Sequence, residues 1–180
     1  MSEKELIKEA IKKNRAAQAN LYHQYKTSWF MICMRYNKNR YDAEDCLQSG
    51  LVSIFSKLSQ FDAKRGTFKS WSHRIIVNAN IQHLKKQQLF RHAELVDEYL
   101  TNDNEADESI EPLTTESMIK LVQQLPPGYR SIFNLYVMEG FTHREISEIL
   151  DISVGTSKSQ LAKGKRMLRN QLELVLKTVY

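Results

Sequence analysis

Basic side chains gather on one stretch near the C-terminus, where they could contact a polyanion. The chain carries five Lys and Arg residues between Val154 and Arg169 and no Asp or Glu. Such side chains contact phosphate oxygens, and near the start of a helix they reach base edges in the DNA major groove. The stretch is therefore a candidate DNA-binding helix. Its outward face is expected to carry Lys158, Ser159, Ala162, Lys163 and Lys165, with Arg166 and Arg169 placed for phosphates.

The elements that must position this face have the pattern of a helix-turn-helix. Thr142 and Glu145 are spaced as a capping box at the start of a short helix over 142–150. Ser153 is a favourable N-cap for a second helix. Two helices joined in this way place the second in the major groove. A helical hairpin with a solvated basic face is the alternative. The inward stripe of the second helix is expected to be Val154, Ser157, Leu161, Gly164 and Leu168.

A second candidate surface lies on a helix predicted to begin after Thr67. Basic and amide side chains beside aromatic rings suit single-stranded DNA, because bases stack on rings while cations follow phosphates. Trp71 is expected to be a core residue, and a stacking platform is the alternative. The inward residues are expected to be Phe68, Trp71, Ile75, Ala79 and Leu84, and the outward ones Lys69, His73, Arg74, Asn78, Gln82, Lys85 and Lys86.

Enzymatic chemistry finds little support in the residue pattern. Asp42 is predicted to cap a helix, with Glu44 and Asp45 in its first turn, although such carboxylates could also serve acid–base work or a metal. The five histidines and two cysteines show no metal-ligand spacing. There is no glycine-rich phosphate loop and no nucleophile elbow. We expect no catalytic site, no metal and no cofactor.

The distribution of charge divides the chain into three blocks. Residues 1–87 carry 16 Lys and Arg against 7 Asp and Glu, residues 88–117 carry 1 against 9, and residues 118–180 carry 9 against 5. The apolar residues of the outer blocks recur with helical spacing, for instance over 3–19 and from Asp42 onward. Six glycines and three prolines are few for a strand-rich protein. The prediction is an all-α protein of two small domains, 1–87 and 118–180, joined by a flexible acidic linker.

The cellular compartment is predicted from the lack of a membrane-spanning segment and of a signal peptide in the sequence. The longest apolar runs are far shorter than the ~20 residues that cross a bilayer, and the charged N-terminus does not resemble a signal peptide. Two cysteines outside any CxxC pair suit a reducing environment. We expect a cytoplasmic protein without a membrane span.

Several segments together resemble one protein family. Residues 42–55, DAEDCLQSGLVSIF, resemble the DAEDLVQE-F helix of bacterial RNA polymerase sigma factors, and residues 61–78 resemble their F-RG-F-WL-RIA-N stretch. The segments LPPGYR at 125–130, EGFTHREISEIL at 139–150 and ISVGTSKS at 152–159 resemble LP-YR, EG-SYEEIAEIL and ISVGTVKS. Their order and spacing resemble those of the extracytoplasmic-function (ECF) subfamily of the sigma-70 family.

The resemblance implies partners and roles. Residues 1–87 would be the region 2 domain, which binds core polymerase through its beta-prime clamp and recognises and melts the −10 element. Residues 118–180 would be the region 4 domain, which reads the −35 element near the beta flap, and an anti-sigma factor is a further candidate partner. The implied polymerase-binding residues are Asp42, Glu44, Asp45 and Gln48. The implied −10 residues are Arg65, Lys69, Trp71, Arg74, Asn78, Gln82, Lys85 and Lys86. The implied −35 residues are Arg144, Thr156, Lys158, Ser159, Ala162, Lys163, Lys165, Arg166 and Arg169.

The chain departs from the family pattern at some of these positions. Ser157 replaces a usual apolar residue, which predicts weaker packing of the recognition helix. Gln160 stands where arginine is common, and Gly164 where a larger residue often sits. A free-standing helix-turn-helix regulator is the alternative function, and it leaves the first 87 residues unexplained. A nucleic-acid-processing enzyme is a third option, and it lacks a catalytic constellation.

Overall fold

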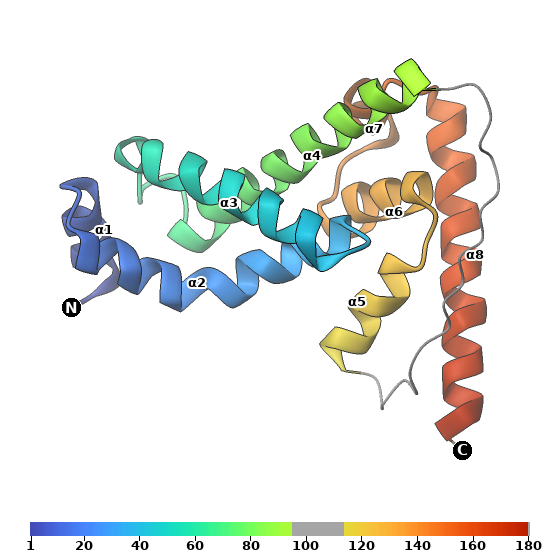
Figure 1. Ribbon diagram of the computed structural model, residues 1–180, viewed down its shortest axis with the longest axis horizontal. Helices are drawn as coiled ribbons and strands as arrows, with labels where there is room; N and C mark the ends of the chain where they lie inside the picture. The colour runs from blue at the N-terminus through green and yellow to red at the C-terminus, as the bar shows by residue number, and fades with distance from the viewer. Residues whose placement is uncertain (95–113, 180) are drawn as a thin grey trace. The chain divides into compact units, whose positions relative to one another are not determined.

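The computed structural model describes residues 1–94 and 114–179, and these are helices joined by short turns, without a strand (Figure 1). The all-α prediction is confirmed. The chain divides into two compact units, Met1–Gln82 and His83–Tyr180. Most of the predicted acidic linker falls at 95–113, outside the described residues. Within the two described ranges, no helix is both long and apolar enough to cross a membrane.

The first unit is built from four helices and a short 3-10 turn. Helix α1 packs on α2, and α2 packs on α3. Helix α4 begins in this unit and continues beyond residue 87, where the first domain was predicted to end. The elements are α1 (Glu3–Ile11), α2 (Arg15–Tyr36), α3 (Arg40–Ser56), η1 (Leu58–Gln60) and α4 (Phe68–Glu94).

The predicted helix over 3–19 is interrupted. Helix α1 ends at Ile11, and Lys13 adopts a left-handed conformation with φ of 65°. Asn14 then begins α2, because its side-chain oxygen accepts the Ala17 N–H at 3.2 Å. An asparagine that caps the next turn competes with continued helix, although the apolar spacing runs through it.

Helix α3 begins earlier than predicted, so the assignment of Asp42 as its N-cap is wrong. The cap is Asn39, whose Oδ1 accepts the Asp42 N–H at 2.8 Å. The Asp42 carboxylate in turn accepts from the Asn39 side-chain amide at 3.0 Å. Asp42 is therefore the third helical residue, and Glu44 and Asp45 lie beyond the first turn. Asparagine caps as well as aspartate does, so residue type alone could not choose between them.

Aromatic rings form the core that holds the start of α4. Phe68 and Trp29 are each 1% exposed, with ring centroids 6.4 Å apart. Tyr25 stacks on Trp29 at 5.5 Å, and Phe61 meets Phe68 edge-on at 5.6 Å. Thr67 begins the helix as predicted, because its hydroxyl accepts the Ser70 N–H at 3.2 Å.

The inward stripe of α4 differs from the prediction between Phe68 and Leu84, which are both buried as predicted. Ser72, Ile76 and Asn80 are fully or almost fully buried, whereas Ile75, one of the predicted inward residues, is half-buried. The shift follows from polar residues that find partners inside. The Trp29 indole N–H donates to Ser72 Oγ at 3.1 Å. A pattern based on hydropathy places such residues outside.

Two amides and two thiols form a buried polar cluster between α2, α3 and α4. Asn37 donates to Asn80 Oδ1 at 2.9 Å, and Asn80 donates to Cys33 Sγ at 3.4 Å. Asn37 also lies 3.6 Å from Cys46 Sγ. Burial raises the pKa of the Cys33 thiol to about 11 and that of Cys46 to about 12. Both thiols are therefore protonated and unreactive at neutral pH.

The second unit is organised around one long helix. Helices α5, α6 and α7 each pack on α8. Pro127 occupies the first helical position of α6, and Gly140 turns the chain shortly after the following π-helical turn, with φ of 78°. The described elements are α5 (Thr115–Gln123), α6 (Pro127–Phe133), η2 (Asn134–Met138), α7 (His143–Leu150) and α8 (Val154–Val179).

The predicted inward stripe of α8 is only partly buried. Val154 is 39% exposed and Leu168 is half-buried. On α5, Ile119 is buried whereas its neighbour Met118 is 44% exposed. Leu161 and Gly164 are buried as predicted. Val154 is the first residue of α8, where a side chain projects beyond the helices that cover the next turn.

Candidate nucleic-acid interface

The predicted helix-turn-helix is present in α7 and α8. Thr142 and Glu145 form the capping box of α7, with the Glu145 carboxylate accepting the Thr142 N–H at 2.7 Å. These hydrogen bonds lower the Glu145 pKa. Asp151 turns the chain in the left-handed conformation, with φ of 52°. Ser153 then caps α8 by accepting the Thr156 N–H at 2.9 Å.

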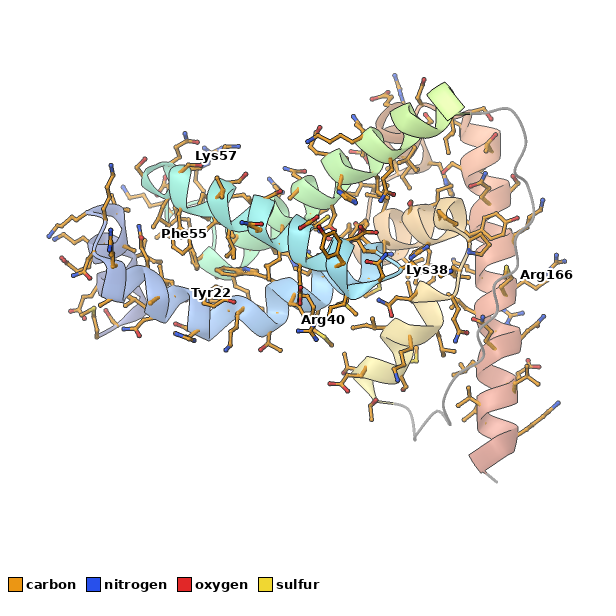
Figure 2. The ribbon with its side chains drawn as sticks, viewed as in Figure 1. Tyr22, Lys38, Arg40, Phe55, Lys57 and Arg166 are labelled. Atoms are coloured by element: carbon orange, nitrogen blue, oxygen red, sulfur yellow. The ribbon has the colours of Figure 1, made fainter. Side chains whose placement is uncertain are left out.

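The basic residues of α8 lie on its solvent-exposed side. Figure 2 shows Arg166 projecting from α8 on the side away from α6. Thr156 is half-buried, and its hydroxyl lies 2.8 Å from the capping Ser153 hydroxyl. Lys165 is exposed but also contacts a side chain of its own unit, because its ammonium lies 5.7 Å from the Tyr136 ring centroid. The exposed members are Lys158, Ser159, Ala162, Lys163, Lys165, Arg166 and Arg169.

Close packing behind this face explains two of the departures from the family pattern. A Cβ added at Gly164 would lie 3.3 Å from Tyr129 Cβ, so glycine lets α8 approach α6 closely. Ser157 is 0% exposed, and its hydroxyl lies 2.9 Å from His143 Nδ1. The predicted weak packing at Ser157 is replaced by a buried hydrogen bond to α7. The sequence pattern could not predict this pair, because His143 and Ser157 are fourteen residues apart on different helices.

Arg144, the remaining predicted −35 residue, lies on α7. Its side chain is exposed, and its Nε lies 3.6 Å from the Glu148 carboxylate. An exposed pair of this kind contributes little to stability, on the order of 0–1 kcal/mol. Arg144 is therefore available to a ligand.

The second candidate surface follows the exposed side of α4. Arg74, Asn78, Gln82 and Lys86 are exposed at intervals of four residues, so they share one side of the helix. Lys69 is exposed near the helix start, and Lys85 is half-buried.

Trp71 is the aromatic residue of this surface, and it was predicted both as an inward residue of the helix and as a −10 residue. Its ring is half-buried and packs on Phe61 and Phe68, with centroids 5.5 and 5.7 Å away. It is therefore a core residue whose side chain is partly exposed. Arg65 is exposed in the preceding loop, where its N–H donates to the Asp62 carbonyl at 3.0 Å.

The residues predicted to bind polymerase lie on α3. Asp45 and Gln48 are exposed, and Glu44 is exposed but paired with Arg40 at 2.7 Å. Asp42 is half-buried and held by Asn39, so it is the least accessible of the four.

Two large apolar side chains extend this face of α3 and were missed from the sequence. Tyr41 is 73% exposed and Val52 is 66% exposed. With Asp45 and Gln48 they recur every three or four residues, which places all four on one side of the helix. The signal in the sequence was the helical spacing of Tyr41 and Val52, which places them on the side of α3 opposite its buried residues. Those buried residues are Ala43, Cys46, Leu47, Gly50 and Ile54.

Within 1–94 and 114–179, no three His, Cys, Asp or Glu side chains are grouped so that they could hold a metal ion.

Comparison with known proteins identifies both halves of the chain. The family model for sigma-70 region 2 matches residues 21–90, and the model for sigma-70 region 4 matches residues 115–168. These ranges contain the α3 and α4 surfaces and the α7–α8 motif.

Individual relatives agree with the family models. The chain is 29% identical over 180 residues to the ECF RNA polymerase sigma factor SigW of Bacillus subtilis, covering 94% of this chain and 96% of that protein. It is 27% identical over 157 residues to the ECF sigma factor SigE of Mycolicibacterium smegmatis, covering 84% of this chain and 60% of that protein. A solved structure of the sigma factor RpoE with the anti-sigma factor NepR from Bartonella quintana matches at 17% identity with a TM-score of 0.49, covering 86% of this chain and 96% of that chain. The chain belongs to the sigma-70 family, as a member of its ECF subfamily of RNA polymerase sigma factors.

Proposed function

We propose that this sigma factor divides promoter recognition between its two units. As a sigma factor it binds core RNA polymerase and promoter DNA and directs transcription initiation. Residues 1–87 form the region 2 domain, whose exposed α4 side contacts the −10 element. Residues 118–180 form the region 4 domain, whose α8 reads the −35 element. The observation that carries the proposal is the exposed basic face of α8, which has no acidic residue from Val154 to Arg169, together with the capped α7 that precedes it.

The α4 surface suits the −10 element because strand opening exposes bases. Amide side chains at Asn78 and Gln82 can hydrogen-bond to unpaired bases, and Arg74 and Lys86 can follow the backbone. The exposed part of the Trp71 ring offers a stacking surface, and Arg65 and Lys69 are exposed close to it in the sequence. Arg74, Asn78, Gln82 and Lys86 line one side of α4, so a single strand could contact all four.

The polymerase-binding surface is the stripe Tyr41, Asp45, Gln48 and Val52 on α3. Protein interfaces combine a desolvated apolar centre with charged residues that steer association. Two exposed apolar side chains that flank an exposed carboxylate have that composition. Glu44 and Asp42 belong to the rim of this surface, since each already has a partner within the chain.

The remaining expectations concern setting and partners. The protein acts in the cytoplasm, where its template and polymerase are, and it performs no catalysis of its own. An anti-sigma factor is a candidate regulator, by analogy with the RpoE complex that contains NepR. Free-standing regulation is not favoured, because it gives residues 21–90 no role.

Site-specific photo-crosslinking tests this division of labour. A crosslinker placed at Ser159 should label DNA at the −35 element, and one placed at Asn78 should label the −10 element, both in complexes with core polymerase. A crosslinker at Val52 should label polymerase and not DNA. Labelling of the −10 element from Ser159, or of DNA from Val52, would contradict the proposal.

A further inference from the structure

His143 occupies a junction between three elements of the second unit. It is the first residue of α7, and its ring stacks on Tyr136 of η2 with centroids 4.4 Å apart and planes at 23°. Its Nδ1 lies 2.9 Å from the hydroxyl of Ser157, in the first turn of α8. The imidazole is half-buried and Ser157 is fully buried. One side chain thus touches both partners that flank α7.

The contacts continue back to α8. Lys165, also on α8, places its ammonium over the Tyr136 ring at 5.7 Å. Ser157 and Lys165 are eight residues apart, which separates them by about 12 Å along a helix axis. The sequence of contacts Ser157–His143–Tyr136–Lys165 therefore begins and ends on α8. We call these four residues the bracket. A helix held at two points two turns apart is restrained in both its tilt and its rotation.

We infer that His143 is a positioning residue for reading the −35 element, and that the bracket sets the rotation of the first turns of α8. The inference rests on the proposed role of α8 as the −35 reader. Lys158 and Ser159 directly follow Ser157, and each residue turns about 100° around a helix. A change in the rotation of α8 at Ser157 would therefore move their side chains relative to base edges.

The bracket should affect base readout more than overall DNA affinity. Hydrogen bonds to base edges depend on the angle and distance of the donor. Arg166 and Arg169 lie two turns or more beyond Ser157, and a long basic side chain can follow a phosphate through a small rotation. The signature of a weakened bracket is therefore lost discrimination with an unchanged dependence of affinity on salt. A merely structural role for His143 would not produce this separation.

The test uses complexes of the full chain with core polymerase and two promoters that share a −10 element. One promoter keeps its −35 element and the other has it scrambled, and the ratio of the two affinities is measured over a range of salt concentrations. The variants are His143→Ala, Ser157→Ala and the double variant. His143→Asn serves as a rescue, because the asparagine amide can bond the Ser157 hydroxyl from nearly the same place as Nδ1. Ser131→Ala is the matched control, since it removes another buried hydroxyl, one bonded within α6 to the Pro127 carbonyl at 2.8 Å.

We expect Ser157→Ala to lower the affinity ratio about twofold to tenfold, as the loss of one hydrogen bond would. His143→Ala should lower it at least as much, the double variant no further than His143→Ala, and His143→Asn should restore part of it. The salt dependence should match that of the unmodified chain in every case. Should His143→Ala fail to fold by circular dichroism, Ser157→Ala carries the test, because it removes one hydroxyl.

The inference is overturned if folded Ser157→Ala and His143→Ala keep the full ratio, or if Ser131→Ala lowers it equally. It is also overturned if the loss of affinity is the same on both promoters. An unmodified chain that binds both promoters equally would instead refute the proposed −35 reading itself, and with it this inference.

Discussion

Helices α4 and α8 are both proposed to contact promoter DNA, but different kinds of contact hold them in place. Both are long, both carry an exposed basic side and neither has an acidic residue in its first turn. The start of α4 is held by large rings, with Phe68 packed among Trp29, Phe61 and Tyr25. The first turn of α8 is held by the buried Ser157 hydroxyl, which lies 2.9 Å from His143 Nδ1. Further along α8, Gly164 allows close approach to α6.

The difference predicts how each helix responds to change. Burial of a large ring contributes several times the free energy of one hydrogen bond. The orientation of α4 should therefore be insensitive to single polar substitutions, and its weak point is the ring cluster. The orientation of α8 depends on a few directional contacts, so small substitutions behind its basic face should alter function before they alter the fold.

The largest expected effect is on the stability of the first unit. Phe68→Ala removes a fully buried ring and should cost about 3–5 kcal/mol of unfolding free energy. Ser157→Ala in the second unit should cost about 1 kcal/mol. The two tryptophans, Trp29 and Trp71, both lie in the first unit, so their fluorescence reports its denaturant unfolding alone, while circular dichroism reports both units. Equal costs for the two substitutions would remove the contrast between α4 and α8.

The next effect separates polymerase binding from DNA reading. Asp45→Lys reverses an exposed charge beyond the first turn of α3, so the helix should persist. It should weaken binding of core polymerase by roughly tenfold or more if the partner surface is basic. Binding is measured by titration of labelled protein with core enzyme, and circular dichroism checks the fold. Lys57→Glu, an exposed reversal at the other end of α3, is the matched control and should bind normally. Loss of helix together with binding would show that Asp45 is structural.

Within α8, substitution of two basic residues should impair DNA binding in different ways. Lys158→Ala should cost about 1–3 kcal/mol at one position of the −35 element and relax its base preference. Arg169→Ala should weaken binding evenly across sequences and reduce the salt slope by about 0.9. Binding to a panel of single-base −35 variants at several salt concentrations measures both. An unchanged base preference in Lys158→Ala would show that this part of α8 does not face the bases.

The sequence predicted where helices begin in both units better than it predicted which side chains are buried. Capping at Thr67, Thr142 and Ser153 was readable because it depends on neighbours three residues apart. The inward stripe of α4 was misplaced because Ser72 and Asn80 are buried with partners from distant helices. Local spacing carries no information about such pairs.

The candidate sites show the same limit. The exposed face of α8 followed from helical period and composition, and so did most of the α4 face. Asp42 was misread as a cap because Asn39 has equal capping strength. The pair of His143 and Ser157 could not be predicted, since the hydrogen bond exists only once α7 and α8 are packed together.

The smallest expected effect concerns acid stability. Hydrogen bonds from Thr142 lower the folded-state pKa of Glu145 below the ordinary value of 4.5. A lowered folded pKa gives stability that is present above the unfolded pKa and is lost as pH falls through the folded pKa. The free energy of unfolding of the second unit, measured with denaturant, should therefore fall in that acidic range. Glu145→Gln keeps the capping box without a titrating group and should lose part of this acid dependence. An unchanged acid profile in Glu145→Gln would show that other groups account for it.

The most direct test of the central claim is footprinting of promoter DNA by the full-length protein with and without core polymerase. Both DNA-facing helices must engage one promoter, and two binding surfaces on separate units bind more tightly when a partner fixes their spacing. With core polymerase, protection should cover the −10 and −35 elements together, and without it protection should be weak. Tight, sequence-specific protection by the protein alone, unchanged when core polymerase is added, would contradict the account and favour a free-standing regulator.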